Sequence, residues 1–151
     1  MKSTTQHLLE LWQEARTRFE NQLKAITPEQ LAWKLGAAPN SVGFLIRHIG
    51  DVELLFAKNV FGASEVKVVA RTVIDKADSG EWTNLEELLT YVQHSRETLS
   101  AIIAAQSDTD WESSIVTKEF GTKTKAEALG RIVSHTAYHA GQMAMVLKYG
   151  V

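Results

Sequence analysis

Four long stretches of this chain repeat apolar residues every three or four positions, a spacing that favours amphipathic helices. They run from about Thr4 to Ile26, from Asn40 or Ser41 to Asn59, from Thr83 to Gln106 and from Thr124 to Tyr149. An amphipathic helix must bury its apolar face against another element. Four such helices predict an all-α fold, a four-helix bundle, and the length of 151 residues favours a single domain over residues 1–151.

Polar residues mark where three of these helices should begin. Ser41 is a suitable N-cap for the second helix, because its hydroxyl can accept a hydrogen bond from a free backbone N–H of the first turn. Thr83 with Glu86, and Thr124 with Glu127, have the spacing of a capping box. We therefore expect the third helix to start after Thr83 and the fourth after Thr124.

Two connections between the helices are long. The first, Val60 to Trp82, contains the β-branched run 66–74, and the second, Trp111 to Lys123, contains the run 113–120. Each run predicts a short extended ribbon. Simple up-down-up-down bundles need only short loops, so long connections indicate at least one crossover along the bundle.

Composition excludes several classes of function. The 16 basic and 18 acidic residues give a net charge of −2, which does not suit a nucleic-acid-binding protein. No stretch approaches 18 apolar residues, and no signal-peptide pattern follows Met1, so we expect no membrane span and a cytoplasmic location. The chain has no Cys, which excludes disulfides, thiolate metal ligands and a Cys nucleophile.

Three of the five histidines have the placement of metal ligands. His135 and His139 are four residues apart, and residues at that spacing are neighbours on one helix face. Helical geometry puts His139 about 20° and His135 about 60° from Ile132, so both rings should face the interior. His48, on the second helix, should be half inside. Three imidazoles would leave a fourth position on Zn²⁺ for water or substrate. Buried histidines paired with local polar groups are the alternative.

Two polar residues could orient these rings. Asp51, three residues after His48, could accept a hydrogen bond from the second ring nitrogen of His48. Gln142, three residues after His139, could act in the same way or orient a bound water. The alternative for both is a partly exposed polar residue at the edge of a helix.

The remaining histidines and the local motif limit the chemistry. His7 and His94 are predicted to be exposed, since they lie near a chain end and away from the apolar stripe of the third helix. The metalloprotease motif His-Glu-x-x-His needs Glu after its first His, but Thr136 follows His135. Peptidase chemistry of that type is not expected.

The segments Asn40-Ser-Val-Gly-Phe-Leu-Ile-Arg-His48 and His135-Thr-Ala-Tyr-His139-Ala-Gly-Gln142, in this order, resemble the DinB/YfiT-like superfamily of small bacterial metal-binding proteins. The resemblance covers essentially the whole chain. It implies an up-down-down-up four-helix bundle, a homodimer, and a divalent metal held by His48, His135 and His139. Ala140 stands where relatives commonly have Arg, so any anion contact made by that Arg is absent here.

The resemblance also implies classes of activity. Relatives with assigned chemistry include transferases that join a low-molecular-weight thiol such as bacillithiol to an electrophile, and isomerases that use mycothiol. We therefore expect transfer of such a thiol co-substrate to a small-molecule electrophile. The alternatives are a metal-dependent hydrolase and a non-catalytic, metal-stabilised dimeric stress-related protein. Zinc is the favoured ion; three imidazoles also suit nickel, iron or copper.

Overall fold

The computed structural model covers residues 1–151 and is mostly helical. The elements are α1 (Thr4–Leu23), η1 (Pro28–Ala32), α2 (Val42–Asn59), α3 (Arg71–Ile74), α4 (Leu85–Ala104), η2 (Asp108–Glu112), β1 (Ser114–Thr117), β2 (Gly121–Thr124) and α5 (Lys125–Tyr149), where η marks a 3₁₀ helix. The prediction of a helical fold is confirmed, with one two-stranded sheet added. No helix combines the length and apolar character that crossing a lipid bilayer requires.

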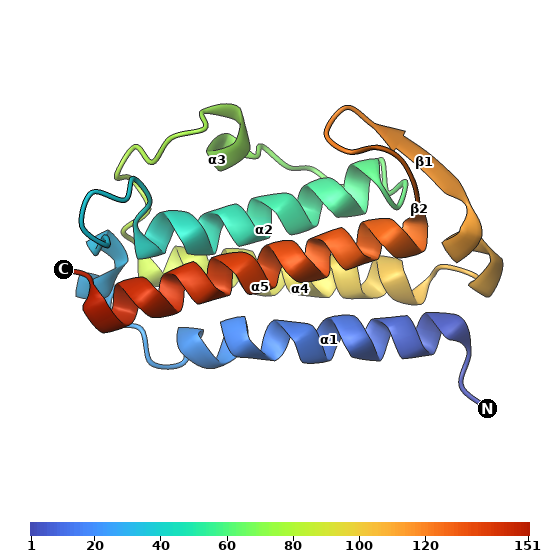
Figure 1. The fold of residues 1–151 in the computed structure, drawn as a ribbon, viewed down its shortest axis with the longest axis horizontal. Coiled ribbons are helices and arrows are strands. Elements are labelled where there is room, and N and C mark those ends of the chain that lie inside the picture. Colours follow the sequence, from blue (N-terminus) through green and yellow to red (C-terminus); the bar gives the residue numbers. More distant parts are fainter.

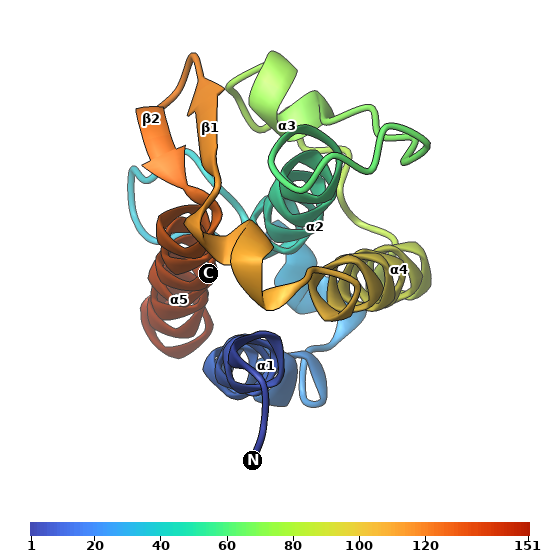
Figure 2. The ribbon, with the colours of Figure 1, turned by 90° about the vertical axis from the view of Figure 1, so that its right-hand side faces the viewer.

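The four long helices α1, α2, α4 and α5 lie alongside one another (Figure 1). In that view α1 and α5 run towards the left, and α2 and α4 run towards the right. Seen end-on, α2 and α1 each lie beside both α4 and α5 (Figure 2). The connection from α2 to α4 therefore returns along the length of the helices. It carries α3, which lies with the β1–β2 hairpin on the outer side of α2 and α5.

Two buried apolar clusters follow one another along the helices. One includes Ile49 and Met143, and the other includes Trp12 and Ile132, and each of these side chains is at most 1% exposed. On α5 the last buried residue of the second cluster is Ile132, and the first buried residue of the first cluster is Ala140, eight residues later. The stretch that holds His135 and His139 thus lies where the two apolar clusters meet.

The predicted starts of α2 and α5 are confirmed. The Ser41 hydroxyl accepts a hydrogen bond from the N–H of Phe44 at 3.2 Å. At the start of α5, Thr124 Oγ1 accepts from the N–H of Glu127, and the Glu127 carboxylate accepts from the N–H of Thr124. Both helices that carry the histidines therefore begin at a side-chain cap, which marks where each starts.

Two local predictions are wrong. The cap of α4 is Asn84, not Thr83, because the Asn84 side chain accepts from the N–H of Glu87 one residue further on. The run 66–74 forms no ribbon: it has no partner strand, and its end instead coils into α3. A strand needs a neighbour for its backbone groups, whereas a helical turn satisfies its own.

The second long connection does form the predicted ribbon. Strand β1 pairs with β2 in antiparallel register, with Ser114 opposite Thr124 and Thr117 opposite Gly121. Gly121 has a φ of 70°, a left-handed conformation that glycine adopts without steric cost at the turn. The hairpin leads directly into α5 and stands over the same side of the molecule as α3 (Figure 2).

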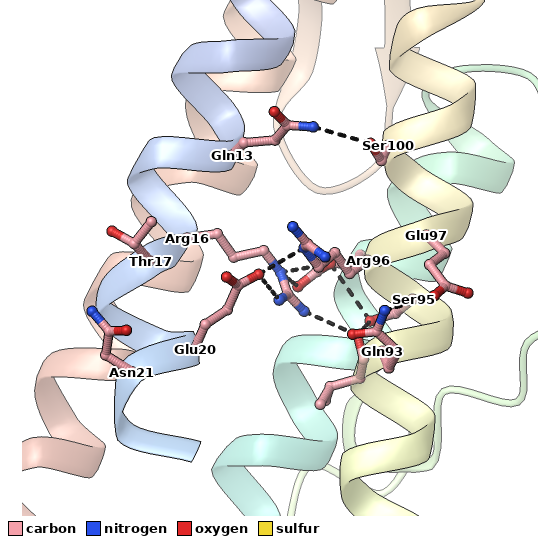
Figure 3. A network of polar contacts seen from close by, with 12 residues as sticks. Gln13, Arg16, Thr17, Glu20, Asn21, Gln93, Ser95, Arg96, Glu97 and Ser100 are labelled. Atoms are coloured by element: carbon pink, nitrogen blue, oxygen red, sulfur yellow. Dashed lines mark hydrogen bonds and ion pairs between the residues drawn. The ribbon is translucent and has the colours of Figure 1, made fainter. Parts of the chain in front are cut away.

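A buried ion pair joins α1, α2 and α4. Arg16 of α1 is 3% exposed and donates from Nε to the fully buried Glu53 at 3.0 Å, from Nη1 to Glu20 at 2.8 Å and from Nη2 to the carbonyl of Val92 at 3.1 Å. Glu20 also accepts from Arg96 on α4 (Figure 3). Burial raises the pKa of Glu53 to about 7, although the neighbouring Arg16 opposes this shift.

Candidate metal centre

The three predicted histidines lie together between α2 and α5. The ring centroid of His48 is 5.0 Å from that of His135 and 4.8 Å from that of His139, and the two rings on α5 are 4.4 Å apart. One ring nitrogen from each residue lies within 4.8 Å of the other two. All three rings are partly buried. The helices thus bring His48 together with two imidazoles that lie 87 and 91 residues later in the sequence.

The spacing of the nitrogens suits one shared cation. Nitrogens bound to a tetrahedral Zn²⁺ at about 2.0–2.1 Å lie roughly 3.4 Å apart. The Nε2 atoms of His48 and His135 are 3.1 Å apart. The widest separation, at most 4.8 Å, can contract to this range by rotation of the side chains. Three neutral nitrogen donors and no carboxylate in the set favour zinc or another first-row transition ion over magnesium or calcium.

Thr72 on α3 fixes the protonation of His48. The Thr72 hydroxyl donates to Asp51 Oδ2 at 2.7 Å, so it accepts from His48 Nδ1, 3.0 Å away. The proton of His48 is therefore on Nδ1, and Nε2 keeps a free lone pair that points at His135. A ligand imidazole oriented through its other nitrogen is the usual arrangement in metal sites.

Asp51 anchors this arrangement from the protein interior. It is 0% exposed and accepts from the Thr72 N–H at 3.1 Å, from Tyr91 Oη at 2.6 Å and from Arg47 Nε at 2.9 Å. The Arg47 guanidinium lies over the Tyr91 ring at 3.6 Å. Gly50 makes room for that ring, because a Cβ there would lie 2.8 Å from it. Four donors on one carboxylate leave Asp51 no freedom to reach His48 directly.

The two rings on α5 are held unequally. His139 Nδ1 lies 2.7 Å from Gln142 Oε1, which can only accept a hydrogen bond. The ring proton of His139 is therefore on Nδ1, and the Nε2 atom of His139 also has a free lone pair. His135 Nδ1 is buried and has no partner. If His135 Nε2 donates to His48, Nδ1 is left as a buried acceptor without a donor. If Nδ1 carries the proton, two Nε2 lone pairs face each other at 3.1 Å, a conflict that a cation between them removes.

Burial keeps all three imidazoles neutral. It lowers the pKa of His48 to about 4 and that of His135 to about 3, and the neighbouring imidazoles add to both shifts. Burial also lowers the pKa of His139, against the hydrogen bond that its ring donates to Gln142. A metal binds only the neutral ring, so at neutral pH no proton has to be displaced.

A pocket of about 820 Å³ opens beside this centre. It extends along the groove between α2 and α5 and is bordered by the β1–β2 hairpin and α3. Its lining consists of His48, Val52, Leu55, Phe56, Asn59, Val60, Val73, Val116, Thr117, Lys118, Glu119, Phe120, Arg131, Ser134, His135 and Tyr138. Its volume lies within the range of small-molecule sites. Two of the three clustered imidazoles therefore face a space that a small molecule can enter.

The other predicted positions are also settled. His7 and His94 are exposed and lie outside the cluster, as predicted. Asp51 does not bond His48 directly; the hydroxyl of Thr72 lies between them. Sequence reasoning missed Thr72, which is 24 residues from His48 and carries no local signal of this role. Ala140 is 3% exposed and packs in the apolar core.

Comparison with known proteins supports the family expected from the histidine segments. No curated protein and no solved structure matches the chain significantly. The sequence model of the DinB superfamily matches residues 11–143, a range that includes all three clustered histidines. The chain therefore belongs to the DinB superfamily.

Proposed function

We propose that this protein is a metal-dependent transferase that joins a low-molecular-weight thiol to a small electrophile. His48, His135 and His139 hold the ion, and the pocket beside them holds the reacting molecules. Membership of the DinB superfamily and the chemistry of the donor set support a divalent ion, for which zinc is the first choice.

The observation that carries the proposal is the pocket at the histidines. A metal that only stabilised the fold would have its fourth position filled by protein and closed. Here His48 and His135 line a pocket of about 820 Å³, large enough for a thiol of tripeptide size. This opening supports an enzyme over the non-catalytic alternative.

The residues of the chain have distinct roles in this proposal. His48, His135 and His139 would hold a divalent ion, which would lower the pKa of a bound thiol and so supply a thiolate at neutral pH. Because the chain has no Cys, the nucleophile comes from outside. Thr72 holds His48, and Gln142 holds His139, each in the tautomer that presents Nε2. Apolar side chains such as Val52 and Leu55 limit water in the pocket.

The helix arrangement and the surface of α5 support two further parts of the proposal. The helix directions in Figure 1 suit the up-down-down-up bundle that the superfamily resemblance implies.

Three large side chains on α5, those of Tyr138, Met145 and Tyr149, are 65%, 48% and 60% exposed. They lie on one stripe of the helix, because Met145 and Tyr149 follow Tyr138 by seven and eleven residues, which are close to whole numbers of helical turns. We propose that this stripe pairs two copies; Met145→Glu should then yield monomers in analytical ultracentrifugation.

Thiol transfer is tested with protein prepared without a His tag and loaded with Zn²⁺. Bacillithiol, cysteine and glutathione are each offered with 1-chloro-2,4-dinitrobenzene, and the thioether product is followed by absorbance. In this reaction the thiolate sulfur forms a bond to the ring carbon, chloride leaves, and the thiol proton passes to solvent. We expect turnover with at least one thiol, and its loss in His139→Ala.

His94→Ala is the matched control, since His94 is an exposed histidine outside the cluster. It should retain full turnover. Absence of turnover with every thiol at full metal occupancy contradicts the proposal. Hydrolysis of p-nitrophenyl acetate by the same sample would then favour the hydrolase, and inactivity towards both would favour the non-catalytic protein.

A further inference from the structure

The pocket beside the histidines is elongated and has a chemically uneven wall. On α2 its lining begins at His48 and ends at Asn59, eleven residues later, which spans about 16 Å of helix. Apolar side chains from α2 and the hairpin cover most of this length, including Leu55, Val116 and Phe120. A compact polar molecule would leave much of this apolar wall in contact with water. The shape suits an extended molecule with an apolar body.

The charged groups of the lining come from the hairpin and from the turn of α5 that precedes His135. The lining contains two cations, Lys118 and Arg131, and one carboxylate, Glu119. Arg131 is on α5, one helical turn or about 6 Å along the axis from His135. Its guanidinium lies over the Phe120 ring, 4.8 Å from the centroid, which limits its freedom. Its nearest carboxylate, Glu119, is 3.9 Å away and 73% exposed, so this ion pair is weak.

We propose that the pocket binds an extended molecule with an apolar body and one terminal carboxylate, which Arg131 holds one helical turn from His135 while the apolar body lies along α2 and the hairpin. An Arg fork matches the two oxygens of a carboxylate, and the apolar wall strengthens that contact by excluding water. The inference rests on the proposed function only in naming the molecule on which the metal centre acts.

The residue after His139, Ala140, brings no charge to the pocket. Ala140 is packed in the core with residues such as Met143, so a charged side chain at that position would have to leave the apolar cluster. Arg131 reaches the pocket from the opposite end of the histidine segment. The proposed carboxylate contact is therefore assigned to Arg131.

The test measures binding to metal-free protein, so that its result does not depend on thiol transfer. The dissociation constants of 6-phenylhexanoate and of 6-phenylhexan-1-ol are compared by calorimetry in the presence of a chelator. We expect the acid to bind about tenfold more tightly than the alcohol, the effect of one charge-assisted hydrogen bond pair at a half-exposed position. Arg131→Ala should remove this preference, and Arg131→Lys should retain part of it.

Two further variants keep the result specific. Arg18→Ala, at an exposed Arg on α1 away from the pocket, should keep the full preference. Leu55→Trp should weaken binding of both ligands, because it fills the apolar part. Equal affinity for acid and alcohol, binding of neither at millimolar concentration, or a preference that survives Arg131→Ala overturns the inference. Acid binding without thiol transfer would refute the proposed reaction and leave this inference standing.

Discussion

The cluster around Arg16 and the cluster around His48 are both polar groups buried between helices, but only the first is complete. Arg16 finds acceptors on Glu53, Glu20 and the carbonyl of Val92. The histidines leave His135 Nδ1 without a partner and bring two Nε2 atoms to 3.1 Å. A buried polar group without a partner costs free energy. The unpartnered His135 Nδ1 therefore indicates that the histidine cluster does not serve stability alone. The comparison separates a structural polar cluster from a candidate binding site.

The largest expected effect is on stability and arises at the complete cluster. Arg16→Ala should lower the free energy of unfolding by about 3–5 kcal/mol, because it leaves the Glu53 carboxylate buried without its cation. Urea denaturation measures this loss. Zinc affinity should stay within about twofold of wild type, since the two clusters share no residue. A large loss of zinc affinity would show that the clusters are not separate.

The next effect concerns metal affinity and arises outside the histidines themselves. Thr72→Val should weaken zinc binding about 10- to 100-fold, because His48 loses the acceptor that fixes its tautomer. Isothermal titration in competition with a chelator measures the change. Thr136→Val is the matched control: Thr136 is buried beside His135, but its hydroxyl has no partner. Equal zinc affinity in Thr72→Val and wild type would remove Thr72 from the site.

Gln142→Leu should have a smaller effect of the same kind. Gln142 orients His139 through one hydrogen bond, but it has no further buried anchor of the kind that Asp51 gives Thr72. We expect zinc affinity to fall about tenfold, at the low end of the effects of such partners. The same titration measures it. A loss as large as that of Thr72→Val would mean that the two supports contribute equally.

The smallest effects are expected from pH, and the two clusters should respond in opposite directions. The histidines have lower pKa values folded than unfolded, so in metal-free protein their contribution to stability is present above pH 6.5 and is lost as pH falls towards 4. Glu53 has a raised pKa, so its contribution is present below pH 4.5 and is lost as pH rises through 7.

Urea midpoints of metal-free protein between pH 4 and 8 measure both slopes. Replacing His135 with Leu should reduce the rise of stability with pH between about 4 and 6.5, and replacing Glu53 with Gln should remove a fall of stability with pH between about 4.5 and 7. The neutral-pH midpoint alone does not distinguish the two clusters. An acidic slope that is unchanged in His135→Leu would contradict the assignment of neutral, buried imidazoles.

The helices and the three histidines could be predicted because helical periodicity is a local signal. Spacings of three and four residues give the buried faces directly, and they placed His135 and His139 inward without knowledge of the neighbouring helix. The capping box at Thr124 likewise depends on residues three apart. These features need only the chain near them.

The parts that could not be predicted depend on distant contacts. Thr72 acquires its role only because α3 folds back onto α2, where Asp51 accepts both its N–H and its hydroxyl. The run 66–74 is β-branched, and nothing local shows that it has no strand to pair with. At the start of α4, Thr83 and Asn84 both have a Glu three residues later, so pattern alone does not choose between them.

Metal titration of the three-histidine cluster tests the central claim most directly. Metal-free protein is titrated with Co²⁺, whose visible absorption reports a four-coordinate nitrogen site, and then with Zn²⁺ to displace it. We predict one ion per chain, lost in His48→Ala, His135→Ala and His139→Ala and retained in His7→Ala and His94→Ala, with circular dichroism unchanged in all five. No bound ion in wild type, or one ion retained in all three cluster variants, would contradict the account.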